Sequence, residues 1–126
     1  MTQRILIADD SPTFRRLEQE LLHRSGYELI HAEDGAQAVK IATEQQPDLV
    51  LLDLEMPVMD GRKALTVLKS GTRTRDIPVI VISTGSRDEQ AVVALGAQGF
   101  LPKPITAGAL MAAVRSTIGA ADPKRR

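Results

Sequence analysis

The sequence contains no cysteine and no tryptophan, and aromatic residues make up only 2% of its 126 residues. Without cysteine the chain has neither a disulfide framework nor a thiolate metal site. Because Phe14, Tyr27 and Phe100 are the only aromatic residues, the core must consist mainly of aliphatic side chains. A chain of this length fits one domain around a single core.

Long hydrophobic runs are also missing. No stretch is long and apolar enough to cross a bilayer, so we expect no membrane insertion. The segment from Met1 to Asp10 holds one short apolar run followed by two acids, from which we expect no signal peptide. Together with the lack of cysteine, these features predict a cytoplasmic protein.

The formal net charge is zero, but the charges are unevenly distributed. Residues 1–60 carry 12 acidic and 5 basic side chains, whereas residues 61–126 carry 4 acidic and 11 basic ones. The acidic first half favours a cation or a basic partner. The basic residues of the second half are scattered, and the terminal Lys124-Arg125-Arg126 is too short for a nucleic-acid patch. We therefore expect no direct binding of nucleic acid.

Short β-branched runs alternate with helical patterns along the chain. The expected strands are residues 5–8, 27–32, 49–52, 79–82 and 99–102, and the expected helices are residues 12–25, 34–46, 61–69, 87–95 and 107–118. Two of the strands are apolar at every position, which is typical of strands covered on both faces. The pattern predicts an α/β fold, a doubly wound five-stranded parallel sheet with helices on both faces. We assign residues 1–119 to this domain and residues 120–126 to a C-terminal tail or the start of a linker.

In such sheets, ligands bind beyond the carboxyl ends of the strands. Polar side chains follow four of the expected strands: Asp9 and Asp10, Asp53, Ser83 and Thr84, and Lys103. Two carboxylates about 4 Å apart repel by roughly 4 kcal/mol at an effective dielectric constant near 20. Three carboxylates at one edge should therefore hold a proton or bind a cation, and hard oxygen ligands suit Mg²⁺.

Each of these features has a simpler explanation when it is taken alone. Asp9-Asp10 could be a helix-capping or solvated pair, and Asp53 could be an ordinary turn residue at a strand end. The joint placement of these acids with Lys103 at one sheet edge favours a functional site.

With Asp60-Gly61 and the segment Asp53-Leu54-Glu55-Met56-Pro57, this pattern resembles the signature of response-regulator receiver domains. These domains are the phospho-acceptors of two-component signalling. The resemblance extends from Arg4 to Ile118. It implies a flavodoxin-like (βα)5 fold with strand order 2-1-3-4-5, an order taken from the family rather than from the periodicity of this sequence.

The resemblance also implies roles for the acidic residues. Asp53 is the expected nucleophile, which accepts a phosphoryl group from a histidine kinase. Asp10 and Asp53 are expected to ligate Mg²⁺, or Mn²⁺ in its place, together with the backbone carbonyl of Glu55. Asp9 is expected to act through a water molecule.

Further roles fall on the last two strands. Lys103 is expected to neutralise charge on the phosphoryl oxygens, and its peptide bond to Pro104 is expected to be cis. Ser83 is the implied switch hydroxyl, a position where the family usually has threonine. Phe100 is the implied paired aromatic that moves inward with this hydroxyl, and its alternative is a half-buried aromatic at the sheet edge.

The sequence departs from the family pattern in three places. Thr84 stands where the family prefers a very small residue. The segment between Ser83 and Lys103 is shorter than usual, so we expect the fourth helix or the loop before it to be trimmed. Glu55 adds a fourth acid near the site, either as a solvated side chain or with an effect on the attacking water, and the sequence does not decide between these two.

The implied partners are a histidine kinase or phosphotransfer protein upstream, and a protein target or fused output domain downstream. Such a chain is no enzyme beyond self-phosphorylation and self-dephosphorylation. One alternative is a phosphohydrolase with an aspartyl nucleophile, which would need two acids spaced two positions apart after the first strand and usually a cap domain. A flavin module would need a hydroxyl-rich phosphate loop after the first strand, where this sequence begins with the acids Asp9-Asp10. A third alternative is a receiver that signals through protein contacts without phosphate.

Overall fold

The computed structural model describes residues 3–9, 12–56, 59–85 and 88–119. Within these residues, five strands alternate with five helices. The strands are β1 (Arg4–Ala8), β2 (Glu28–Ala32), β3 (Leu49–Asp53), β4 (Val79–Ser83) and β5 (Gly99–Pro102). The helices are α1 (Pro12–Arg24), α2 (Gly35–Gln45), α3 (Gly61–Ser70), α4 (Asp88–Ala94) and α5 (Ala107–Ile118).

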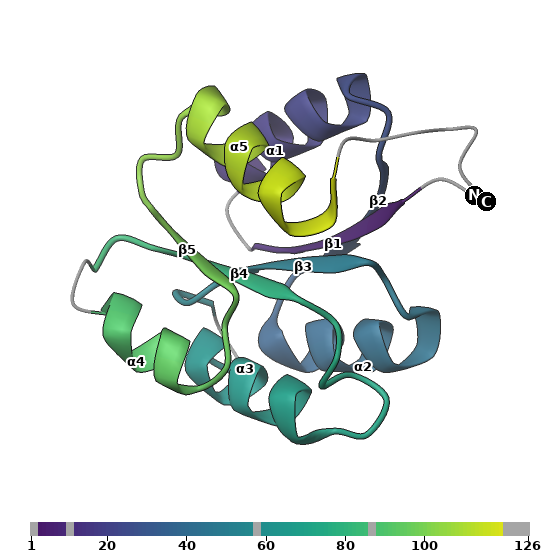
Figure 1. Ribbon diagram of the computed structural model, residues 1–126, viewed down its shortest axis with the longest axis vertical. Coiled ribbons are helices and arrows are strands. Elements are labelled where there is room, and N and C mark those ends of the chain that lie inside the picture. Colours follow the sequence, from purple (N-terminus) through teal and green to yellow (C-terminus); the bar gives the residue numbers. More distant parts are fainter. Residues whose placement is uncertain (1–2, 10–11, 57–58, 86–87, 120–126) are drawn as a thin grey trace.

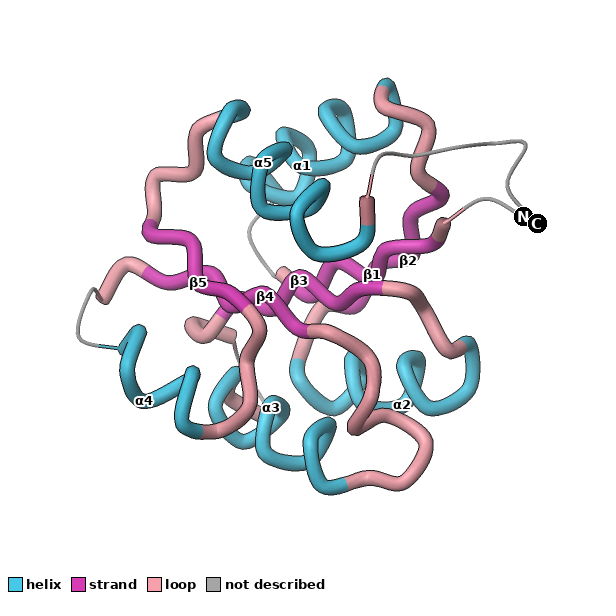
Figure 2. Tube along the Cα trace, in the orientation of Figure 1, coloured by secondary structure: helices cyan, strands magenta, loops and turns pink. Residues whose placement is uncertain are grey.

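The strands form one parallel sheet in the order β2-β1-β3-β4-β5. The sheet is the middle of three layers (Figure 1), with α1 and α5 on one face and α2, α3 and α4 on the other. Figure 2 shows the same arrangement, with the strands in magenta between two layers of helices in cyan. The doubly wound fold and the strand order implied by the family resemblance are therefore confirmed.

The hydrophobic core has two parts because neighbouring residues of each strand point to opposite faces of the sheet. Leu6, Val50 and Val81 pack against the helical layer of α2, α3 and α4. Ile5, Leu51 and Ile80 pack against α1 and α5. Strands β3 and β4, which contain the apolar runs 49–52 and 79–82, are buried at every position, as predicted for strands covered on both faces.

The element boundaries differ from the predicted ones mainly at capping residues. Asp34 lies outside α2 as its N-cap, where its side chain accepts a hydrogen bond from the Gln37 backbone N–H. Leu95 lies outside α4, because the chain turns there into Gly96, whose φ of 105° ends the helix. α4 has seven residues and is the shortest of the described helices, in the segment where a trimmed helix is predicted. Asp10, Pro57, Arg87 and residues 120–126 lie outside the described residues.

Gly61 fixes the approach of α3 to the chain segment that follows β3. A Cβ atom at this position would lie 2.4 Å from Leu54 Cα and 2.6 Å from the Asp53 carbonyl oxygen. The Gly61 backbone N–H also donates to the Leu54 carbonyl at 3.1 Å. The start of α3 therefore packs directly on the backbone of Asp53 and Leu54, and only glycine fits there.

We predict that Gly61→Ala lowers the free energy of unfolding by roughly 1–3 kcal/mol, because the added methyl group meets backbone atoms that cannot move independently. Gly108→Ala is the matched control, since a Cβ at Gly108 in α5 meets nothing within 4 Å. This control should be neutral or stabilising by up to about 1 kcal/mol. Urea unfolding followed by circular dichroism measures both changes, and equal effects of the two substitutions would contradict this role of Gly61.

Candidate functional site

Two buried carboxylates lie at the carboxyl edge of the sheet, on neighbouring strands. Asp53 is the last residue of β3 and Asp9 directly follows β1, and each is only 1% exposed. The pairing of Ala8 with Leu52 in the parallel register brings these two strand ends together. Parallel pairing therefore places two acids, 44 positions apart in the sequence, at one edge.

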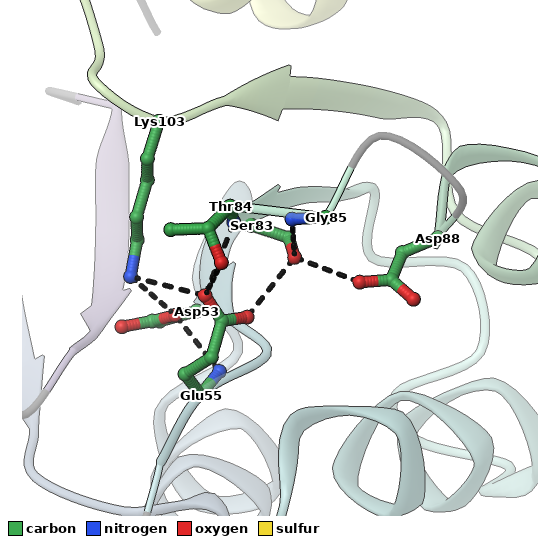
Figure 3. Close-up of polar contacts among 7 residues, drawn as sticks. All are labelled: Asp53, Glu55, Ser83, Thr84, Gly85, Asp88 and Lys103. Carbon is green, nitrogen blue, oxygen red and sulfur yellow. Dashed lines mark hydrogen bonds and ion pairs between the residues drawn. The ribbon is translucent and has the colours of Figure 1, made fainter.

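Lys103 brings a positive charge to Asp53 from the end of β5. Figure 3 shows the Lys103 side chain extending toward Asp53. Its Nζ lies 2.9 Å from Asp53 Oδ1, and the side chain is only 9% exposed. Its backbone N–H donates to the Ser83 carbonyl at 2.9 Å, which fixes Lys103 against the end of β4. The Lys103–Pro104 peptide bond is cis. The sheet thus unites the candidate nucleophile and the candidate lysine in one buried ion pair.

The protonation of Asp53 reflects a balance between burial and these partners. Burial raises the pKa of Asp53, whereas the hydrogen bonds from Lys103 and from the Glu55 backbone N–H lower it, and the pKa comes to about 6. Burial disfavours the charged form of Lys103, but its hydrogen bond and ion pair with Asp53 outweigh this effect and raise the lysine pKa. Asp53 is therefore an aspartate whose negative charge is only partly compensated.

Glu55 connects the loop after β3 with the end of β4. Its Oε2 accepts a hydrogen bond from Ser83 Oγ at 3.0 Å. Its Oε1 accepts from the Thr84 backbone N–H at 3.1 Å and from Thr84 Oγ1 at 3.0 Å, and lies 3.6 Å from Lys103 Nζ. Burial opposes the charged form of Glu55, but the hydrogen bonds from Thr84 and Ser83 outweigh it and lower the pKa of this carboxyl. The side chain is 44% exposed, yet it is fixed by these contacts rather than simply solvated.

Ser83 Oγ lies between two carboxylates. Besides Glu55, it faces Asp88 Oδ2 at 2.9 Å, and it accepts a hydrogen bond from the Gly85 backbone N–H at 3.1 Å. Asp88 in turn forms an ion pair with Arg62 of α3. Asp88 and Arg62 are not predictable from the sequence, because their contact depends on how α4 is placed against α3, and no motif signals it.

Phe100 is half-buried on β5 and packs against the core part that faces α2, α3 and α4. Its register partner is Val81 on β4, and β4 separates Phe100 from β3. This position matches the description of a half-buried aromatic near the edge of the sheet. Whether it moves with Ser83 remains a prediction.

The acidic residues fit a small divalent cation. Asp53 Oδ2 is buried and has no hydrogen-bond partner among the described residues, although buried carboxylate oxygens normally have one. Its neighbour Asp9 adds a second hard oxygen donor, as Mg²⁺ prefers. The described residues alone contain no group of three or more metal-ligating side chains. The remaining predicted side-chain ligand, Asp10, lies outside the described residues.

A doubly wound parallel sheet of this order, with a buried aspartate–lysine pair at its carboxyl edge, has the architecture of a receiver domain. The family model of the response regulator receiver domain matches residues 5–115, so the chain belongs to this family. The family membership predicted from the sequence motifs is therefore confirmed. No described helix combines the length and the apolar character that crossing a membrane requires.

Curated relatives cover nearly the whole chain. The polar-differentiation response regulator DivK of Brucella ovis is 31% identical over 121 residues, which are 94% of this chain and 98% of DivK. The transcriptional regulatory protein PrrA of Mycobacterium bovis is 38% identical over 116 residues, which are 90% of this chain but only 48% of PrrA. The chain is thus similar to nearly the whole of one regulator and to about half of another.

Solved structures share the fold. The chemotaxis response regulator CheY4 of Vibrio cholerae has a TM-score of 0.87 and 27% identity, with 93% of this chain and 99% of that chain covered. The receiver domain of the sensor histidine kinase PA1611 of Pseudomonas aeruginosa PAO1 also has a TM-score of 0.87, with 28% identity and coverage of 95% and 100%. That structure holds a magnesium ion in its active-site cleft.

We predict that Asp53→Asn becomes more stabilising, relative to the unsubstituted protein, as the pH rises from about 4 to about 6. The raised pKa means that the folded protein binds the Asp53 proton more tightly than the unfolded chain does, whose aspartate has its ordinary value of 3.8. The contribution of Asp53 to stability is therefore complete below pH 4 and lost as the pH rises through 6, a change of about 3 kcal/mol. Asparagine does not ionise, so its contribution to the free energy of unfolding does not change over this pH range.

Urea unfolding of both proteins between pH 3.5 and 7.5, in the presence of a chelator, measures this difference. The chelator removes divalent cations, which would favour the ionised carboxylate. A difference in unfolding free energy that stays constant over this range would show that Asp53 titrates normally.

Proposed function

We propose that this chain accepts a phosphoryl group on Asp53 from a histidine kinase or phosphotransfer protein, in a Mg²⁺-dependent reaction in the cytoplasm. The observation that carries the proposal is the buried Asp53 carboxylate with Lys103 Nζ at 2.9 Å and an oxygen, Oδ2, without a hydrogen-bond partner among the described residues. Such a carboxylate is incompletely neutralised and lies next to a cation that can bind phosphoryl oxygens. The activity is that of a phospho-acceptor, with no enzymatic activity beyond self-phosphorylation and self-dephosphorylation.

The chemical step is a phosphoryl transfer. A carboxylate oxygen of Asp53 attacks the phosphorus atom, the bond from phosphorus to the donor imidazole nitrogen breaks, and that nitrogen keeps the electron pair. Lys103 then donates to the phosphoryl oxygens and stabilises their charge as it develops. The carboxylates of Asp10 and Asp53 and the backbone carbonyl of Glu55 would hold Mg²⁺, with Asp9 acting through a water molecule. The ion would supply further charge neutralisation when bound.

Ser83 and Phe100 are the groups to which we assign the conformational response. A phosphoryl group carries a charge close to −2 near neutral pH and adds three acceptor oxygens. A change from mostly inactive to mostly active requires about 5.5 kcal/mol of differential interaction, whereas one charge-assisted hydrogen bond contributes about 1.5–3 kcal/mol. The new bond to Ser83 therefore acts together with Lys103, the metal and repacking around Phe100. The switched surface would bind a downstream protein target or a fused output domain.

Acetyl phosphate with Mg²⁺ tests the acceptor role directly. The unsubstituted protein should gain one phosphoryl group, seen by intact mass, and hydroxylamine should remove it because an acyl phosphate is labile. Asp53→Asn should gain none, whereas the control Asp76→Asn, at an exposed aspartate before β4, should be phosphorylated normally. Uptake by Asp53→Asn would remove Asp53 from this role.

Lys103→Met should slow phosphoryl uptake by roughly 10²-fold, because the transition state loses a preorganised donor to the phosphoryl oxygens. Lys103→Arg should restore only part of the rate, since the planar guanidinium group does not reproduce a compact ammonium. The rate of mass gain with acetyl phosphate measures both effects, and NMR titration checks that Mg²⁺ still binds. A Lys103→Met rate within threefold of the original would contradict this role.

A further inference from the structure

The Glu55 carboxylate already binds the hydrogen-bond donors around Asp53. Figure 3 shows Ser83 and Thr84 facing Glu55 from the end of β4, with Lys103 reaching in from β5. Lys103 Nζ touches both acids, at 2.9 Å from Asp53 Oδ1 and 3.6 Å from Glu55 Oε1. The donors therefore converge on a carboxylate that lies beside the candidate nucleophile.

These donors form an anion-binding set of one backbone N–H, two hydroxyl groups and one ammonium group. Such groups bind a carboxylate and a phosphoryl group by the same charge-assisted hydrogen bonds. The Thr84 backbone N–H has a single proton, and so has the Ser83 hydroxyl. Neither donor can serve Glu55 and a phosphoryl oxygen fully at the same time.

We propose that Glu55 is a positioning residue that substitutes for the phosphoryl group in the unphosphorylated state. Its carboxylate holds Ser83 and Thr84 and leaves them when a phosphoryl group on Asp53 takes over these donors. The inference rests on the proposed phosphorylation of Asp53. It adds that the Glu55 carboxylate competes with the phosphoryl group for the same hydrogen-bond donors. Glu55 thereby lowers the affinity of the site for phosphoryl analogues and stabilises the unphosphorylated arrangement.

The surroundings of Glu55 allow such a displacement. Its side chain is 44% exposed, so the carboxylate can return to solvent without being buried elsewhere. A cavity of about 540 Å³ lies beside it and is lined in part by Glu55 itself and by Arg62 and Lys63 of α3. The same cavity is also lined by Asp60 and Asp88, and Arg62 already pairs with Asp88, so what it offers the displaced carboxylate is access to solvent.

Thr84 offers a cleaner probe of this exchange than Ser83. Ser83 Oγ faces Asp88 Oδ2 at 2.9 Å as well as Glu55 Oε2 at 3.0 Å, so its proton is shared between two acids. Both hydrogen bonds that the structure gives for Thr84 go to Glu55 Oε1. Loss of Glu55 should therefore change the Thr84 amide in the unphosphorylated state above all.

Titration with beryllofluoride in the presence of Mg²⁺ tests the proposal on the whole chain. Beryllofluoride should bind Glu55→Ala roughly tenfold more tightly than the unsubstituted protein, the change expected from one competing charge-assisted hydrogen bond. Glu55→Gln should show a smaller gain, because its amide oxygen still accepts hydrogen bonds without the charge. Glu89→Gln removes the same charge from an exposed position on α4 and should change the affinity by less than twofold.

The Thr84 amide signal in ¹H–¹⁵N NMR spectra distinguishes competition from a general structural effect. It should differ between the unsubstituted protein and Glu55→Ala without beryllofluoride, and coincide when both proteins are saturated with it. Unchanged or weaker binding by Glu55→Ala and Glu55→Gln would overturn the proposal. A Thr84 signal that still differs at saturation would overturn it too, because Glu55 would then remain in place.

The outcome also separates this inference from the proposed function. If the unsubstituted protein binds beryllofluoride and the Glu55 variants bind it no more tightly, only the role of Glu55 is wrong. If the unsubstituted protein neither binds beryllofluoride nor gains a phosphoryl group from acetyl phosphate, phosphorylation of Asp53 is wrong and the inference is wrong with it.

Discussion

The ion pair between Asp53 and Lys103 is the interaction on which the site depends. Burying a carboxylate in a protein interior costs free energy that one cation repays only in part, and the Asp53 pKa of about 6 reflects this. Under the proposed function, a divalent cation would complete this compensation, and phosphorylation would convert the carboxylate to an acyl phosphate. The ion pair therefore carries a cost in stability, which the proposed phospho-acceptor role would explain.

Some residues of the site lie at buried strand ends, and others lie in exposed loops. Strands β1, β3 and β4 are buried on both faces, and their ends fix Asp9, Asp53 and Ser83. The close contact of Gly61 with the backbone of Asp53 and Leu54 ties α3 to the same place. Glu55 and Thr84, in contrast, lie in exposed loop positions, where side chains can exchange partners without repacking the core.

Sequence reasoning predicts the elements of this fold because the all-apolar runs 49–52 and 79–82 and the intervening helical patterns are strong signals. The order of the strands in the sheet follows only from the family resemblance, since periodicity does not determine which strands are neighbours. The meeting of Asp53 with Lys103 follows from the rule that parallel strand ends share an edge. The contacts of Glu55 with Ser83 and Thr84 depend on side-chain conformations in loops, which no spacing pattern encodes.

The central claim is that Asp53 is the residue that becomes phosphorylated. Borohydride reduction of the acetyl-phosphate-treated protein converts an aspartyl phosphate to homoserine, and peptide mass spectrometry then locates the modified residue without any substitution. The account predicts homoserine at position 53 and at no other aspartate. Homoserine at Asp9 or Asp10, or none in a protein that has gained a phosphoryl group, would contradict it.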